Sequence, residues 1–409
     1  MKAAFVVQRY GLEVNGGGEM LCRQVAERMA RHWDLEILTT CAVDYTTWED
    51  HYPAGVSVLN GVNVRRFRVD FPRVGPLFNR ISESVFAKPG CPELEPRWAR
   101  EQGPYSSDFL RFLEEQGDRY DLFIFFTYLY GLTYFGLPKV ADRSLLLPTA
   151  HDEPPFHLSI YQEIFRAPKG FLFLTPEEQQ LVESKYGTEV PGTLVGAGID
   201  DPGPINPTPF LQRHQGRITK PFLLYLGRID ESKGCRELFD FFIRYRSETG
   251  SQDVQLVLIG KPVMEIPNHP DIVPLGFVSE EEKFQALAAA EALIMPSPYE
   301  SLSMVILESW SVTTPTLVNA RCEVLKGQSQ RSEGGTWYSD YASFRAELSK
   351  LLADPSLRQK LGQNGRKFVL DYCTWDTVEQ HYLACGEWGV ANRIEATRRG
   401  RAVSSPPRM

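Results

Sequence analysis

Two glutamates, Glu300 and Glu308, are separated by seven residues at a predicted junction between a loop and a helix. Residues 292–297 are an apolar run stopped by proline, which is typical of a short buried strand, and residues 304–310 have helical periodicity. Glu300 is therefore expected in the loop and Glu308 about one turn into the helix. Such loops follow the carboxyl ends of strands, where open α/β sheets bind ligands.

This junction has the right groups to hold a phosphorylated ligand. A helix that starts near Ser303 and Met304 would aim free N–H groups at a diphosphate. Glu308 could accept hydrogen bonds from vicinal ribose hydroxyls, and Glu300 from a sugar hydroxyl. The spacing alone supports equally well a plainer interpretation, in which Glu300 complements the helix dipole and Glu308 is solvated.

Two cations in the same half of the chain favour the phosphate interpretation. The apolar residues 222–226 form a predicted strand that ends in Gly227 and Arg228, with Lys233 five residues beyond the arginine. Arg228 can grip phosphate oxygens with its planar fork, and Lys233 can supply a mobile point charge. Taken alone, such a pair would usually be solvated surface charge.

A glycine-rich turn lies near the amino terminus. Residues 3–8 have a buried-strand pattern, and Asn15 is followed by Gly16, Gly17 and Gly18, which open a predicted helix. Glycines at this place let the backbone approach a ligand closely. The spacing fits neither the dinucleotide fingerprint G-x-G-x-x-G nor the phosphate loop G-x-x-x-x-G-K-[ST], so those two interpretations lose support.

Together these three elements resemble glycosyltransferase family 4, the retaining GT-B enzymes that transfer a sugar from a nucleoside diphosphate. The resemblance runs from the glycine turn through residues 195–200 to Gly227–Gly234 and Glu300–Glu308. The chain departs from the family pattern at Ser301-Leu302-Ser303, where many members have Gly-Phe-Gly. It implies two Rossmann-like parallel-sheet domains that face each other across a cleft, with a C-terminal helix that crosses back to the first domain.

The resemblance also implies a role for each matched residue. It implies that the diphosphate is bound by Arg228, Lys233 and the backbone of Ser303 and Met304. Glu308 would bind the ribose, Glu300 the donor sugar, and backbone groups around Val278 the base. Gly17 and Gly18 would contact the diphosphate and sugar from across the cleft. A UDP-sugar is the expected donor, and a saccharide or lipid-linked saccharide is the expected acceptor.

His151 is the histidine with the most informative context. It follows a predicted strand at residues 144–147 and would emerge at the carboxyl end of that strand. The family often has a histidine here, close to the donor sugar and acceptor, which would make His151 catalytic together with Glu300, Arg228 and Lys233. The alternative is a structural histidine bonded to Asp152 or Glu153.

Charge considerations define what the catalytic groups must do. Cleavage of the bond to the nucleoside diphosphate builds negative charge on the departing phosphate, which preorganised cations and N–H groups stabilise. If the reaction retains configuration, the leaving phosphate itself can accept the proton of the acceptor, so no protein nucleophile is nominated. No Asp-x-Asp motif or Cys/His cluster with ligand spacing occurs, and we expect no metal requirement.

Length and periodicity predict two domains in the 409 residues. The predicted parts are an acceptor-side Rossmann-like domain at residues 1–200, a linker at 201–220, a nucleotide-sugar-binding domain at 221–372, a crossing helix at 373–391 and a disordered tail at 392–409. Thr175 and Ser279 are predicted helix caps. Residues 71–107 look irregular and could cover the acceptor or be a plain surface insertion.

Composition narrows the partners and the location. A net charge of −8 argues against a nucleic-acid binder. Seven scattered cysteines and an amino terminus without a secretory signal indicate a cytoplasmic protein. The apolar run at residues 122–138 is shorter than a membrane span and is expected in the core. The arginine-rich tail could make a weak peripheral contact with the inner face of a membrane.

The sequence leaves other functions open. A non-catalytic nucleotide-sugar sensor or assembly subunit would need the same binding residues. A sugar-nucleotide epimerase or a phosphorylase could use the same architecture, although no lysine-bearing pyridoxal phosphate site is identifiable. An NAD oxidoreductase is the remaining alternative, and it is distinguished by whether NAD or a nucleoside diphosphate raises the melting temperature.

Overall fold

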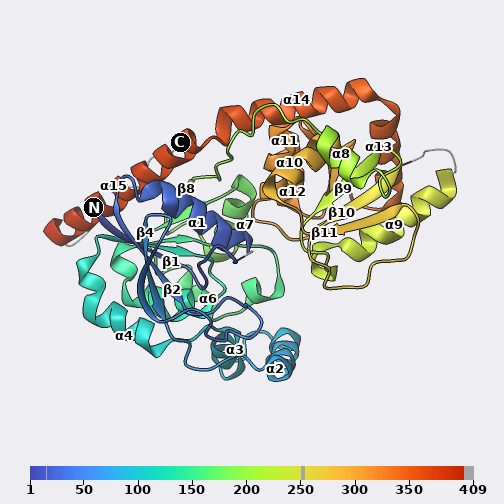
Figure 1. The fold of residues 1–409 in the computed structure, drawn as a ribbon. Helices are drawn as coiled ribbons and strands as arrows, with labels where there is room; N and C mark the ends of the chain where they lie inside the picture. The colour runs from blue at the N-terminus through green and yellow to red at the C-terminus, as the bar shows by residue number, and fades with distance from the viewer. Residues whose placement is uncertain (15, 250–253, 400–409) are drawn as a thin grey trace. The chain divides into compact units, whose positions relative to one another are not determined.

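A computed structural model describes residues 1–14, 16–249 and 254–399 and shows two compact units (Figure 1). The first unit is Met1–Gly196 together with the chain from Val378 on, and the second is Ala197–Thr377. Each unit has its own sheet of mainly parallel strands with helices packed on it, so the predicted α/β class is confirmed. Asn15, which was placed in the glycine turn, lies outside the described residues.

The first unit is built on an eight-stranded sheet, as far as the described residues show, in the order β3-β4-β2-β1-β5-β6-β7-β8. Every neighbouring pair is parallel except β3 and β4, which form an antiparallel edge. The strands are β1 (Lys2–Val6), β2 (Asp34–Thr40), β3 (Gly55–Leu59), β4 (Val62–Phe67), β5 (Leu122–Phe126), β6 (Ser144–Leu147), β7 (Gly170–Phe173) and β8 (Gly192–Leu194). All five residues of β5 are buried, as is usual for a strand covered on both faces.

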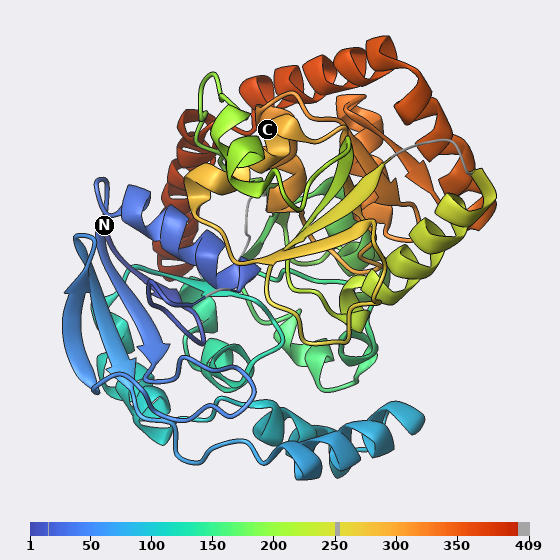
Figure 2. The ribbon, with the colours of Figure 1, turned by 45° about the vertical axis from the view of Figure 1, so that its right-hand side comes forward.

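The helices of the first unit lie between these strands in the chain, except for the last, which begins at the end of the second unit and continues into the first. They are α1 (Gly17–Met29), α2 (Gly75–Ala87), α3 (Leu94–Gln102), α4 (Ser107–Gln116), α5 (Gly131–Gly136), α6 (Tyr161–Ile164), α7 (Pro176–Tyr186) and α15 (Trp375–Arg399), with short 3₁₀ turns η1 (Gly117–Arg119), η2 (Leu137–Lys139), η3 (Ala141–Arg143) and η4 (Pro154–His157). Helices α2 and α3 lie side by side at one end of this unit (Figures 1 and 2). The predicted cap is confirmed, because the Thr175 hydroxyl accepts a hydrogen bond from the Glu178 N–H at 3.2 Å.

The second unit has a parallel sheet in the order β11-β10-β9-β12-β13-β14. Its strands are β9 (Phe222–Leu226), β10 (Gln255–Ile259), β11 (Ile272–Gly276), β12 (Ala292–Met295), β13 (Thr316–Asn319) and β14 (Gly335–Tyr338). Its helices are α8 (Thr208–His214), α9 (Cys235–Thr249), α10 (Glu280–Ala289), α11 (Met304–Ser311), α12 (Glu323–Ser332), α13 (Tyr341–Ala353) and α14 (Pro355–Tyr372), with the 3₁₀ turn η5 (Glu231–Lys233).

Alternate residues of β9 face opposite layers of this second unit. Leu224 packs in one apolar cluster with α10 and α11, whereas Leu223 packs in the other cluster with α9 and α13. Figure 1 shows α9 on one side of the strands and α10 and α11 on the other. The sheet is thus the middle layer of three. Ser279 caps α10 as predicted, with its hydroxyl accepting from the Glu282 N–H at 3.2 Å.

Helix α15 carries the chain back to the first unit, as predicted. A Cβ on Gly386 would lie 2.6 Å from the Trp33 ring, so helix and unit are in close contact there. The predicted end of this helix is wrong, because α15 continues to Arg399 instead of stopping at residue 391. Good helix formers extend an existing helix at little cost. Residues 400–409 of the predicted tail lie outside the described residues.

Two other predictions are wrong, one of a linker and one of an irregular segment. Residues 201–220 are part of the second unit and not a free linker, because Phe210 on α8 is buried in its core. Residues 71–107 are largely helical and not irregular, since α2 and α3 pack on each other and bury Val85 and Trp98. Prolines obscured the helical pattern, although Pro76 and Pro96 lie in first turns, where proline is tolerated.

The seven cysteines are unpaired thiols. Cys91, between α2 and α3, is partly exposed, and the other six are buried: Cys22, Cys41, Cys235, Cys322, Cys373 and Cys385. Within the described residues, no helix has the length and apolar character that a membrane crossing needs.

Candidate active site

The second unit places its candidate residues at a switch in strand order. From β9 the chain proceeds outward through β10 and β11, and then returns to β12 on the other side of β9. Ligands of open parallel sheets bind outside the carboxyl ends of strands at such a reversal. Arg228 and Lys233 follow β9 and Glu300 follows β12, so their loops flank the switch point.

Glycines let these two loops approach each other. Gly234 has a φ of +75°, and a Cβ there would lie 2.3 Å from the Pro296 carbonyl oxygen. That carbonyl accepts a hydrogen bond from the Asn319 side chain at 2.9 Å, so the loop after β12 is also tied to β13. Only glycine fits this contact, which sets the distance between the β9 and β12 loops.

The approach brings Lys233 onto Glu300. The Lys233 Nζ lies 2.8 Å from the Glu300 Oε1, and the lysine side chain keeps more than a third of its surface exposed. The structure therefore joins two residues that the sequence places 67 positions apart. A cation with an exposed surface beside a carboxylate can attract a phosphate while the carboxylate accepts from a hydroxyl.

Arg228 is held by its own turn. Its Nε lies 2.8 Å from the Asp230 Oδ2, and its carbonyl accepts a hydrogen bond from the Tyr225 hydroxyl at 2.7 Å. Burial acts to raise the pKa of Asp230, but its hydrogen bonds with Ser232 and the charge of Arg228 outweigh that effect, and the pKa is lowered. Asp230 is therefore a carboxylate that fixes the direction of the guanidinium.

The start of α11 is at Ser303 and Met304, as predicted. Ser303 is the N-cap, but its side chain makes no cap bond. The first helical bond joins the Leu307 N–H to the Ser303 carbonyl at 3.4 Å. The N–H groups before Leu307 are consequently the unsatisfied donors of a helix start, which is the feature expected to hold a phosphate.

Glu308 lies in α11, one turn in, and pairs with Lys283, a residue that the sequence did not reveal. The Lys283 Nζ lies 2.9 Å from the Glu308 Oε1 and 2.7 Å from the Glu280 Oε2. Burial raises the pKa of Glu308, although Lys283 opposes the rise. Burial alone would lower the pKa of Lys283, but the two carboxylates outweigh it and raise that pKa. Lys283 thus balances the charge of a buried carboxylate.

Val278 lies between β11 and the cap of α10. The preceding Gly276 has a φ of +77°, and Phe277 is 69% exposed. Val278 packs at the margin of the core cluster beneath α10 and α11. Its backbone is accordingly near the helix that carries Lys283, and a role in binding the base stays a prediction.

In the first unit, the glycine turn also lies at a switch in strand order, between β1 and β5. Gly17 and Gly18 are the first two residues of α1, and a Cβ on either would meet no atom within 4 Å. Gly16 differs, because a Cβ there would lie 1.9 Å from the Glu19 Oε2. Gly16 is thus required by packing, whereas Gly17 and Gly18 leave open space beside the helix start.

A buried ion pair below this turn was missed by sequence reasoning. The Glu19 Oε1 accepts hydrogen bonds from the Arg9 Nε at 2.9 Å and from the Gln8 Nε2 at 2.7 Å. Arg9 also donates to the Val43 carbonyl at 2.7 Å. These contacts link the end of β1 to the first turn of α1. The only sequence signal was a glutamate at the third helical position.

His151 emerges beyond the carboxyl end of β6, as predicted. Its Nδ1 lies 3.3 Å from the Glu153 Oε1, which is the contact of the structural alternative. Glu153 in turn accepts from the Tyr128 hydroxyl at 3.4 Å. The imidazole retains 27% of its side-chain surface. The contact with Glu153 therefore orients the ring without enclosing it.

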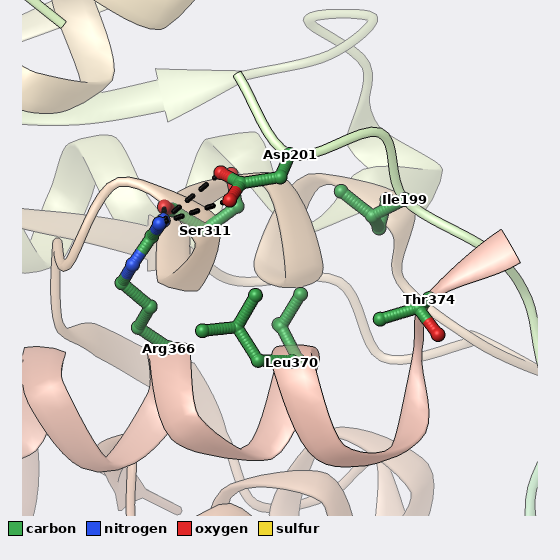
Figure 3. A pocket seen from close by; sticks show the side chains of 7 residues that line it. Ile199, Asp201, Ser311, Arg366, Leu370 and Thr374 are labelled. Atoms are coloured by element: carbon green, nitrogen blue, oxygen red, sulfur yellow. Dashed lines mark hydrogen bonds and ion pairs between the residues drawn. The ribbon is translucent and has the colours of Figure 1, made fainter. Parts of the chain in front are cut away.

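A small cavity of about 20 Å³ lies elsewhere in the second unit (Figure 3). It has room for about one water molecule. Arg366 on α14 borders it and lies 3.1 Å from the Asp201 Oδ2, and it also donates to the Ser311 carbonyl. This cavity is too small for a nucleotide sugar, and its ion pair ties the start of the second unit to α14.

Comparison with known proteins places this geometry in a known fold. Residues 210–368 match the model of the family described as Glycosyl transferases group 1, a segment that lies within the second unit and includes Arg228, Lys233, Glu300 and Glu308. The solved sucrose-phosphate synthase from Thermosynechococcus elongatus superposes with a TM-score of 0.71 at 16% identity, covering 96% of this chain and all of the other. The fold is GT-B.

Two further proteins share parts of this similarity. The GT-B structure of Anabaena HepE in complex with UDP-glucose superposes with a TM-score of 0.64 at 13% identity, over 97% of this chain and 100% of that chain. The MMP α-(1→4)-mannosyltransferase of Mycolicibacterium hassiacum is 28% identical over 210 residues, which is 48% of each protein. The chain spans about half the length of the curated relatives it matches. The resemblance found in the sequence is thus confirmed for the GT-B fold and for group 1 over residues 210–368.

Proposed function

We propose that this protein is a retaining glycosyltransferase of family 4 that moves a sugar from a nucleoside diphosphate to a saccharide or lipid-linked saccharide, as in polysaccharide or glycoconjugate synthesis. The observation that carries the proposal is the pairing of Lys233 with Glu300, 2.8 Å apart, beside the α11 start at the switch point of the second sheet. This segment also carries the group 1 match.

Each group has a task in the proposed reaction. Arg228, Lys233 and the N–H groups at the start of α11 bind the diphosphate and stabilise the charge that develops on it as the sugar departs. Glu300 accepts from a hydroxyl of the donor sugar, and Glu308 accepts from the ribose. The acceptor attacks from the face that the phosphate leaves, and the leaving phosphate oxygen takes the acceptor proton. These cations make a metal ion unnecessary in the proposal.

Residues of the first unit complete the proposal. The family resemblance assigns Gly17 and Gly18 to the diphosphate and sugar, and the open space beside both glycines supports this role. His151 is proposed as the catalytic group near the donor sugar and acceptor, and its orientation by Glu153 supports that role. UDP is the proposed nucleotide, because the fold is shared with a protein solved with UDP-glucose.

Thermal shifts test the donor site. The wild type, Arg228→Ala and Arg236→Ala are measured with UDP, GDP, ADP, TDP and NAD at equal concentration. Ligand at 100 times its Kd stabilises a protein by about 2.7 kcal/mol, which is a readily measured rise. We expect UDP to stabilise the wild type and the control Arg236→Ala, whose guanidinium instead pairs with Glu231. The rise should disappear in Arg228→Ala.

Two readouts separate the alternatives: the thermal shifts, and an assay of free UDP released from UDP-sugars. A shift with NAD alone would overturn the proposal in favour of an oxidoreductase. A shift with a diphosphate that is indifferent to Arg228 would remove the proposed donor site. A nucleotide-sugar sensor would bind UDP but release no free UDP from UDP-sugars with any acceptor, whereas a transferase releases UDP in proportion to the glycoside formed. An epimerase would change the sugar without releasing UDP.

We also propose a cytoplasmic location, with weak electrostatic contact between the arginine-rich end and an anionic membrane face. Sedimentation with vesicles that contain anionic lipid, compared with neutral vesicles, tests this contact. Retention that disappears at high salt is expected. Equal sedimentation with both kinds of vesicle would contradict it.

A further inference from the structure

Glu178, on α7 in the first unit, is a carboxylate with no exposed surface. Its two oxygens accept from different segments of the chain. The Oε1 accepts from the Ala150 N–H at 2.7 Å, and the Oε2 accepts from the Leu174 N–H at 2.8 Å. A glutamate at the third position of a capped helix usually bonds to the backbone of the cap residue. Here it reaches past the cap to join the loop after β6 to the end of β7.

This arrangement is electrostatically unfavourable for the carboxylate itself. Burial raises the pKa of Glu178 to about 7, while the two backbone hydrogen bonds and the charge of His151 act to lower it. Among the described residues, no lysine or arginine pairs with this carboxylate. Burying a carboxylate on two N–H groups alone is unfavourable if the side chain contributes only packing.

The loop that Glu178 holds is itself strained. Thr149 has a φ of +48°, an uncommon conformation for a residue with a branched Cβ. Ala150 follows it and is buried, so its N–H needs an acceptor. His151 comes next and is partly exposed. The Glu178 carboxylate therefore fixes the Thr149–Ala150 peptide, one residue before His151, and stabilises a backbone that would otherwise relax.

We propose that Glu178 is a positioning residue for His151: its two hydrogen bonds clamp the loop after β6 against the end of β7 and so hold the imidazole in its working orientation. The inference rests on the proposed catalytic role of His151. It predicts that Glu178 affects kcat through His151 and leaves the proposed diphosphate contacts of Arg228 and Lys233 unchanged, because those two residues belong to the second unit.

A double-mutant cycle tests this coupling. Glu178→Gln keeps the shape but replaces one acceptor oxygen by an amide donor, and kcat for sugar transfer is expected to fall at least tenfold while the thermal shift with UDP is retained. In a His151→Ala background the same substitution should cause no further loss. Glu183→Gln, a half-buried carboxylate on the same helix, is the matched control and should leave kcat unchanged. An equal loss in both backgrounds, or none in either, would overturn the proposal.

Two measurements keep the test independent of activity. The imidazole NMR signals of His151 should move in Glu178→Gln, whereas those of His214 and His381 should not; an unmoved His151 signal would overturn the proposal. Hydrogen exchange of the wild type needs no variant. The Ala150 and Leu174 amides should exchange slowly, and rapid exchange at Ala150 would show that the clamp does not form. If the wild type transferred no sugar but both measurements gave the expected results, the proposed function would be wrong, whereas the contact of Glu178 with the loop of His151 would be supported.

Discussion

The Lys283 Nζ lies 2.9 Å from the Glu308 Oε1, so a cation on α10 neutralises the carboxylate that is proposed to bind ribose on α11. Both side chains are more than four-fifths buried. Removing either residue should destabilise the protein, because an uncompensated buried charge destabilises a fold more than the intact pair stabilises it.

We therefore expect Lys283→Met to lower the free energy of unfolding by about 3 kcal/mol. The variant should also bind UDP more weakly, since Glu308 would tend to take up a proton once its cation is gone. Urea denaturation and UDP thermal shifts measure the two effects. Lys326→Met is the control, because Lys326 pairs at 3.5 Å with a largely exposed Glu323. Unchanged stability and UDP binding in Lys283→Met would show that the pair is incidental.

Substitutions of Lys233 and Glu300 should distinguish binding of the diphosphate from binding of the sugar. Glu300→Gln is expected to lower kcat by about 10²–10³-fold, the cost typical of losing one preorganised polar contact in a transition state. It should retain the UDP thermal shift, because UDP lacks the sugar that Glu300 contacts. Lys233→Met should lose much of that shift. The opposite pattern would reverse the two assigned roles.

Gly18→Ala should make the protein more stable and less active. Alanine stabilises a helix by about 1 kcal/mol relative to glycine, and a Cβ at Gly18 meets no protein atom within 4 Å. A ligand that approaches the backbone closely would meet that methyl group, so the KM for the donor should rise. Gly16→Ala is the contrasting variant, because its Cβ would clash with Glu19 and reduce stability. A Gly18→Ala enzyme with normal kinetics would exclude close approach at this position.

Stability should depend on pH through Glu178. Its folded-state pKa of about 7 lies above its ordinary value of 4.5, so the folded protein binds this proton more tightly than the unfolded chain does. The contribution therefore favours folding at low pH and is lost as the pH rises from about 4.5 through 7. The difference is on the order of 3 kcal/mol. Urea denaturation between pH 5 and pH 8 should show a flatter profile for Glu178→Gln, and parallel profiles would contradict the assignment.

Most of the fold could be predicted because its central strands are short apolar runs buried on both faces. β5 and β9 are examples, each with all five residues buried. The edge strands β3, β8 and β14 were missed, and so was β4 beside β3, because these strands are short or mix polar and apolar residues and their pairing depends on neighbours. Val56 and Val58 of β3, for instance, are exposed.

The positions of the candidate residues were predictable where these residues belong to one loop or one turn. Glu300, Glu308, Arg228 and Lys233 carry recognisable spacing, and the structure places them as expected around β9 and β12. The roles of Lys283, Arg9 and Glu178 were not predicted. Each role depends on a contact with a partner on another segment of the chain. Lys283 and Glu308, for example, are 25 residues apart and meet only when α10 packs beside α11.

The distribution of thiols has a practical consequence for spectroscopy. Since six of the seven cysteines are buried and Cys91 is partly exposed, a maleimide dye on the native protein should modify Cys91 first. Burial also raises the pKa of Cys41 and Cys322 to about 11, which keeps these thiols protonated and slow to react. A single fluorophore could therefore be attached between α2 and α3 without any substitution, where its emission would report on ligands that contact those two helices.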